Sequence, residues 1–203
     1  NNNIHVTYGN TIDNIYSTNT GDHISEHGIP NLHTSNHGDI PLARGEHTAI
    51  VLHNRMYVFG GVTLEYKYMN DLYYFDIENM QWNVVDSIVT TNSKRTILPP
   101  RRAGHAIVKN YTNNDEFYIF GGRGDGFGRE VLGYNDIWRF SSVTNQWTCL
   151  TTIEQSRRNM ADSPVGRQYS AIAMLDDRIY IFGGIDPVTS IIYNDVWSFH
   201  TRT

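Results

Sequence analysis

The chain has 203 residues and a composition typical of a folded globular protein, with 39% hydrophobic, 12% aromatic and 18% charged residues. Its formal net charge of -5 argues against a general binder of nucleic-acid phosphates. No apolar run approaches the roughly 20 residues of a membrane-spanning helix, so we expect neither a nucleic-acid nor a membrane partner.

The cysteine count and the N-terminus indicate the compartment. Cys149 is the only cysteine, which excludes an internal disulfide framework. The first residues lack the basic and then apolar layout of a signal peptide. We therefore expect a cytoplasmic protein.

Residues 1–43 are predicted to be irregular, and four of their five histidines lie close together in sequence and could bind a metal ion: His23, His27, His33 and His37. Gly28, Pro30 and Gly38 interrupt this stretch, so no helix brings the histidines onto one face. We expect a solvated loop here and no metal site.

Three copies of one pattern follow, and each contains an apolar run that ends in a pair of glycines. The runs begin at Met56, Phe117 and Ile179, at intervals of 61 and 62 residues. Self-similarity of this kind is the sequence signature of a repeat architecture. The shared positions are an arginine, the glycine pair and, in two copies, a tryptophan: Arg44, Arg102 and Arg167; Gly60, Gly61, Gly121, Gly122, Gly183 and Gly184; Trp82 and Trp147.

Each repeat is predicted to form four short strands. In the first repeat they lie near Ala49–Leu52, Met56–Phe59, Leu72–Phe75 and Trp82–Val85, where apolar and aromatic residues are bounded by Gly, Asn and Asp. The glycine pair indicates a close approach of two backbones. The third copy ends before its tryptophan, and so before its fourth strand.

The order Arg, His or Ser, apolar strand, Gly-Gly, Asn-Asp, aromatic residue and Trp resembles the kelch repeat, from about Pro41 to the C-terminus. Each kelch repeat forms one four-stranded antiparallel blade of a β-propeller. The resemblance therefore implies an all-β fold, and a chain that supplies about half of a six- or seven-bladed ring.

This resemblance divides the chain at repeat boundaries. Residues 1–43 would be irregular or a degenerate partial blade, 44–101 and 102–166 the first two repeats, and 167–203 a third repeat without its last strand. Closed propellers typically have 4–8 blades. Two alternatives stay open: a window from a longer propeller, or a half-propeller that another chain completes. Incomplete blades would also favour self-association.

Strand direction places the long loops between the second and third strands, and those between repeats, at one end of the blades, which we call the long-loop end. Its loops sum to a charge of +2 in a chain of -5. Long loops on a rigid scaffold usually carry function, and in the kelch family this face commonly holds peptides or proteins. A basic end favours an acidic ligand.

We therefore expect a non-catalytic protein-interaction module without cofactor or metal, which binds an acidic peptide or protein. The candidate binding residues are Arg44, Lys94, Arg95, Arg102, Arg123, Arg129, Arg167 and Tyr66. For the repeated arginines an alternative stays open, in which each forms an ion pair with Asp71, Asp136 or Asp195.

A second function of another class also stays open. Kelch repeats occur fused to Ser/Thr phosphatases and to ubiquitin-ligase adaptor domains, so the resemblance also allows a regulatory propeller of a larger enzyme. One repeated pair of histidines, His47 and His105, favours a shared structural hydrogen bond over catalysis, because a catalytic histidine would not be duplicated.

Overall fold

The protein is described by a computed structural model, which covers residues 40–86, 98–125, 131–151 and 163–202. Every regular element within these ranges is a β-strand, so the all-β prediction is confirmed. None of the described residues forms a helix long and apolar enough to cross a membrane.

The first two repeats each form a four-stranded antiparallel sheet, as predicted. Blade 1, residues 44–86, has the strand order β1-β2-β3-β4, with β1 Thr48–Leu52, β2 Arg55–Phe59, β3 Leu72–Asp76 and β4 Gln81–Val84. Blade 2, residues 102–151, has the order β10-β9-β6-β5, with β5 Ala106–Lys109, β6 Glu116–Phe120, β9 Ile137–Ser141 and β10 Gln146–Cys149.

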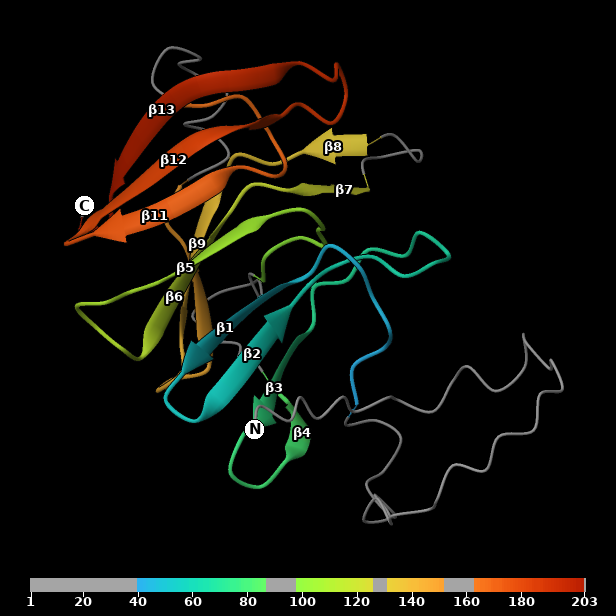
Figure 1. The fold of residues 1–203 in the computed structure, drawn as a ribbon, viewed down its shortest axis with the longest axis vertical. Coiled ribbons are helices and arrows are strands. Elements are labelled where there is room, and N and C mark those ends of the chain that lie inside the picture. The colour runs from blue at the N-terminus through green and yellow to red at the C-terminus, as the bar shows by residue number, and fades with distance from the viewer. Residues whose placement is uncertain (1–39, 87–97, 126–130, 152–162, 203) are drawn as a thin grey trace, which may run out of the picture.

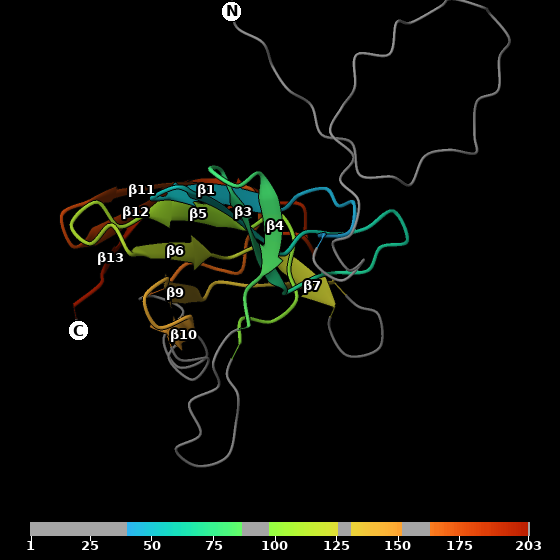
Figure 2. The same ribbon diagram turned by 90° about the horizontal axis from the view of Figure 1, so that it is seen from below.

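The third repeat, blade 3 (residues 167–200), forms a three-stranded sheet. Its strands are β11 Ala171–Leu175, β12 Arg178–Ile185 and β13 Ile192–His200. Figure 1 shows the three sheets side by side, with blade 2 in the middle, and Figure 2 shows the same arrangement from below. The described residues thus form adjacent blades of a partial propeller.

One loop differs from the sequence prediction. Residues expected as a plain loop after the second glycine pair instead form an antiparallel ribbon of β7 Arg123–Asp125 and β8 Val131–Gly133. Arg123 also bridges Ala103 at the start of the blade. The ribbon projects at the right of Figure 1, at the end that also carries the β2–β3 and β12–β13 loops.

Side chains from neighbouring blades form two hydrophobic clusters. The first joins blades 1 and 2 and includes Phe59, Phe117 and Phe140, with Trp147 packed against it. The second joins blades 2 and 3 and contains these buried residues: Val108, Tyr118, Phe120, Ile137, Ile179 and Ile181. Each blade therefore buries its apolar faces against its neighbours rather than within itself.

The glycine pairs connect adjacent blades through the backbone. The Gly61 and Gly122 amides donate to the carbonyl oxygens of Arg102 and Arg167, each over 2.8 Å. Gly121 has a φ of +66°, and a Cβ there would lie 2.6 Å from the carbonyl oxygen of Arg167. A side chain at this position would separate blades 2 and 3.

His105 also lies between blades 1 and 2. Its Nε2 is 2.6 Å from the Thr48 hydroxyl, and its ring packs edge-on against Phe59. Burial, with a smaller contribution from the nearby Arg102 charge, lowers the pKa of His105 to about 3. The imidazole is therefore neutral in the folded protein at any physiological pH.

The first prediction concerns the glycine pair. Gly121→Ala should lower the free energy of unfolding by about 1–3 kcal/mol from its disfavoured φ alone, and by more because of the clash with Arg167. Gly45→Ala is the matched control, because no atom lies within 4 Å of its Cβ position. Equal losses in urea unfolding would contradict this role of Gly121.

The second prediction concerns pH. Between about pH 6.5, the ordinary pKa of histidine, and pH 3, His105 binds a proton only in the unfolded chain. Stability should therefore fall as the pH falls through this window, by up to about 1.4 kcal/mol per pH unit. His105→Gln should flatten this slope in thermal melts, and His47→Gln, at the equivalent exposed position, should not. Parallel slopes for His105→Gln and the parent would show that His105 is not responsible.

Candidate protein-interaction surface

The repeated arginines begin the blades, and Arg102 shows their geometry best. Its Nη1 and Nη2 donate to the two carboxylate oxygens of Asp136 over 2.6 and 2.7 Å. Nη1 also donates to the Gly121 carbonyl over 2.9 Å, and Nε donates to the Pro100 carbonyl over 3.1 Å. The ring of Tyr134 covers the guanidinium at 4.4 Å.

The same arrangement recurs in the other two blades. Arg44 pairs with Asp71 over 2.5 and 3.0 Å, and Arg167 pairs with Asp195 over 2.5 and 3.1 Å. Hydrogen bonds from Arg167 are the main reason that the pKa of Asp195 lies below its ordinary value. Both arginines also donate to the carbonyl of the first glycine of their own repeat.

These contacts agree with the alternative that the sequence left open for the repeated arginines, in which each forms an ion pair with an aspartate. The side chains of Arg44, Arg102 and Arg167 are 3%, 0% and 1% exposed. Each is held in a bidentate ion pair with the aspartate of its own blade. A ligand could reach them only by displacing that aspartate, so in this structure the three arginines fix the start of each blade.

Arg123 lies in a different position, at the long-loop end where the three blades meet. It forms what we call the Arg123 cluster with residues of blades 1 and 3: Glu46, Tyr68, Gln168 and Tyr169. Its Nε donates to the Tyr68 hydroxyl over 3.1 Å, and Nη1 donates to the Tyr169 hydroxyl over 3.0 Å and to the Gln168 side-chain oxygen. Nη1 and Nη2 lie 2.6 and 2.8 Å from the two carboxylate oxygens of Glu46.

The cluster is charged and partly open to solvent. The side chains of Arg123 and Glu46 are 19% and 30% exposed. Burial acts to lower the pKa of Arg123, but hydrogen bonds to Glu46, Tyr169 and Tyr68 outweigh it and raise the pKa. Burial acts to raise the pKa of Glu46, but hydrogen bonds from Arg123 and Tyr169 leave it lowered. Both groups are therefore ionised at neutral pH.

The backbone around the cluster is unusual. Glu46 and Tyr169 have φ of 54° and 57°, a region that side chains rarely adopt, and Gly104 occupies the equivalent position in blade 2. The Gly104 amide donates to the Glu46 carbonyl over 2.9 Å, and the Tyr169 amide donates to the Gly104 carbonyl over 2.8 Å. Residues held in such conformations by their surroundings often belong to functional sites.

Sequence reasoning included Arg123 among the candidates but did not connect it with its four partners. The signal was in the repeat alignment, where Gly104 shows that the position two residues after each repeated arginine adopts a left-handed conformation. In the other two repeats, Glu46 and Tyr169 occupy this position in place of glycine. Tyr68 and Gln168 carry no comparable signal, because their roles depend only on contacts between blades.

Of the remaining candidate binding residues, the structure describes Tyr66. Tyr66 is 83% exposed in the β2–β3 loop, close in sequence to the exposed Leu64 and Lys67. Lys94, Arg95 and Arg129 lie outside the described residues, as do the four N-terminal histidines. Within the described ranges, no three His, Cys, Asp or Glu side chains are grouped so that they could hold a metal ion.

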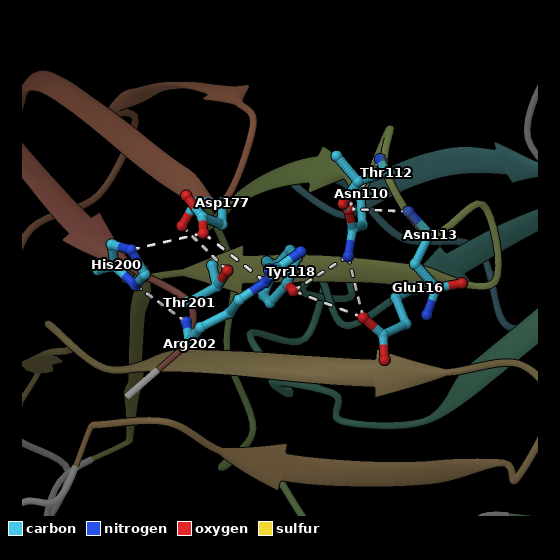
Figure 3. A network of polar contacts seen from close by, with 9 residues as sticks. All are labelled: Asn110, Thr112, Asn113, Glu116, Tyr118, Asp177, His200, Thr201 and Arg202. Carbon is cyan, nitrogen blue, oxygen red and sulfur yellow. Dashed lines mark hydrogen bonds and ion pairs between the residues drawn. The ribbon is translucent and has the colours of Figure 1, made fainter.

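The opposite end of the blades carries a polar cleft of about 270 Å³ between blades 2 and 3 (Figure 3). The Asn110 amide donates to Glu116 over 3.0 Å and to the Tyr118 hydroxyl over 3.3 Å. Asp177 receives hydrogen bonds from Thr201 and lies 3.6 Å from Arg202. These groups bind one another and their charges are of both signs, so the cleft does not favour an anionic ligand.

Comparison with known proteins gives the family. Residues 88–203 match the KLHDC2/KLHL20/DRC7 Kelch-repeats domain, and residues 43–87 match the Kelch motif. Kelch domain-containing protein 3 of Bos taurus is 28% identical over 80% of this chain and 40% of its own length. The flagellar outer-arm dynein alpha chain of Chlamydomonas reinhardtii is 28% identical over 80% of this chain and 3% of its own.

A third relative is an enzyme by name. The N-(sulfonatooxy)prop-2-enimidothioate sulfolyase of Thlaspi arvense is 26% identical over 73% of this chain and 37% of its own length. The chain thus spans well under half the length of each of these relatives. The family matches agree with the repeated Arg–Asp pairs and with the four-stranded sheets. Together they confirm the resemblance seen in the sequence: the chain belongs to the kelch-repeat family.

Proposed function

We propose that this chain is a non-catalytic protein-interaction module that binds an acidic peptide segment at its long-loop end, with Arg123 as the central contact. Kelch repeats generally mediate protein–protein interaction, and this supports the class of function. The observation that carries the proposal is a partly exposed guanidinium that two tyrosine hydroxyls and one carboxylate hold in place.

The chemistry of the cluster favours a carboxylate ligand. Glu46 already gives Arg123 a carboxylate partner, so a ligand carboxylate that replaces it forms the same charge-assisted bonds. Tyr68 binds a nitrogen that Glu46 does not use, Nε, whereas the Tyr169 hydroxyl shares Nη1 with Glu46. Glu46 is therefore an internal competitor of the ligand.

Neighbouring groups could extend this contact along a peptide. Leu64 and Tyr66 are 94% and 83% exposed on the loop that also carries Tyr68, and an exposed aromatic residue is a common anchor in interfaces. Lys94, Arg95 and Arg129 would add positive charge from the same set of loops. Cys149 is the only cysteine of the sequence, so it forms no internal disulfide, which supports a reducing compartment such as the cytoplasm.

A second candidate is a regulatory kelch domain of a larger protein, such as a phosphatase or a ubiquitin-ligase adaptor. The size of the relatives favours it, because this chain aligns with only 3% of the dynein chain and 37% of the sulfolyase. The binding surface would be the same, and the bound segment would then belong to the enzyme or to its substrate.

The third prediction tests the role of Arg123. On an array of random-sequence peptides rich in Asp and Glu, the chain should bind more strongly than to the same peptides carrying Asn and Gln, and binding should weaken with salt. Arg123→Gln should weaken binding by about tenfold or more, as expected when a charge-assisted contact is lost. Arg139→Gln, a partly exposed arginine at the other end of blade 2, is the control. Equal effects of the two changes would rule out the Arg123 site.

The fourth prediction separates ligand binding from stability. Glu46→Gln removes the internal carboxylate but keeps a side chain of the same shape, so acidic peptides should bind several-fold more tightly. The same change should lower the melting temperature, because the ion pair with Arg123 joins blades 1 and 2. Weaker binding after Glu46→Gln would show that Glu46 helps to hold the ligand rather than competing with it.

A further inference from the structure

The β2–β3 loop of blade 1 presents two large apolar side chains to solvent. Leu64 and Tyr66 are 94% and 83% exposed, although Tyr68, two residues further on, is buried. The loop continues the strands as a hairpin in which Val62 bridges both Gly45 and Tyr68, and it projects at the right of Figure 1. The exposed pair therefore lies at the tip of a hydrogen-bonded hairpin at the long-loop end.

Tyr66 also has an unusual backbone conformation. Its φ of 61° lies in the left-handed region, where Gly or Asn is expected in a turn and a bulky residue is an outlier. Two hydrogen bonds close the turn: the Tyr66 amide donates to the Thr63 carbonyl over 3.0 Å, and the Thr63 amide donates to the Lys67 carbonyl over 3.1 Å. Both bonds use backbone atoms alone, so neither requires a tyrosine side chain.

Blade 3 contains the same turn with a serine. In the β12–β13 loop the Ser190 amide donates to the Asp186 carbonyl, and the Asp186 amide donates to the Ile191 carbonyl, each over 2.9 Å. Ser190 also has a φ of 61°, so it is the equivalent of Tyr66 in a loop that is one residue longer. The scaffold accepts a small polar residue at this position. A side chain that breaks a local rule without a structural gain is expected at a functional site.

The tip is joined to the Arg123 cluster through Tyr68. Arg123 donates to the Tyr68 hydroxyl over 3.1 Å, and the Cα atom of Tyr66 is at most about 7 Å from that of Tyr68, at the reach of about 3.5 Å per residue. The two charged residues of the tip, Glu65 and Lys67, are exposed and opposite in sign. The tip therefore does not favour a second acidic residue, and its remaining surface is apolar.

We propose that Tyr66 and Leu64 form a second contact for the peptide that Arg123 binds, and that they select a bulky aliphatic or aromatic residue close to its acidic residue. This inference rests on the proposed function and narrows the ligand class to peptides that combine the two. The Tyr66 ring packs against the apolar side chain of the peptide, and Leu64 extends the contact. Because the hairpin already fixes the backbone of the tip, little ordering is needed on binding.

Synthetic peptides with one Glu in a background of Ser, Gly and Gln test the proposal. Leu or Phe is placed in turn at each position within about four residues of the Glu, a span of about 13 Å in an extended peptide, and binding is measured by fluorescence polarisation. At a defined position the apolar residue should raise the affinity about tenfold. Peptides with Gln in place of the Glu measure the acidic preference separately.

Variants of the chain assign the apolar contact. Tyr66→Ser, which copies the residue of blade 3, should remove the tenfold gain and leave the melting temperature unchanged, whereas Tyr66→Phe should keep the gain. Tyr111→Ser is the matched control, because Tyr111 is a 71% exposed tyrosine in the β5–β6 turn at the opposite end of the blades. This control should bind every peptide as the parent chain does.

The outcomes separate this inference from the proposed function. A gain that is equal in the parent and in Tyr66→Ser, or that is absent at every position, overturns the role of Tyr66. The proposed function still stands in that case if the chain prefers Glu to Gln peptides and Arg123→Gln removes the preference. If the parent chain has no preference for Glu, the proposed function fails and this inference fails with it.

Discussion

The buried ion pair between each repeated arginine and the aspartate of its own blade is the interaction on which the rest of the structure depends. A buried guanidinium is costly unless its donors are satisfied. Arg102 meets that condition with the Asp136 carboxylate and two backbone carbonyls. Its own carbonyl then accepts the Gly61 amide of blade 1. One residue thus fixes the start of its blade and the connection to the blade before it.

The blades could be predicted from the sequence because their signals are local and occur three times. Apolar runs, glycine pairs and tryptophans identify the strands, and strand direction gives the end at which the long loops gather. The β7–β8 ribbon could not be predicted, because its Gly-rich sequence has no alternation of apolar and polar residues. The role of the repeated arginines was also undecided, since a binding arginine and a buried one have the same repeat position.

The candidate site is the part of the protein that could be predicted least well from the sequence. Arg123 stands alone at its repeat position, where Val62 and Ile185 follow the other glycine pairs. Its partners Glu46 and Tyr169 are 77 and 46 residues away in the chain. The repeated residues build the scaffold, and we propose that Arg123, which departs from the repeat, contacts the ligand. Only the packing of three blades brings such a residue together with its partners.

The Arg123 cluster depends on how the three blades pack against one another. Glu46 belongs to blade 1 and Tyr169 to blade 3, and Arg123 of blade 2 binds both. Any change in the angle between successive blades therefore changes the separation of the groups that hold this guanidinium. A ligand that binds this cluster in one arrangement of the blades would therefore stabilise that arrangement, by the difference in its binding free energy between the arrangements.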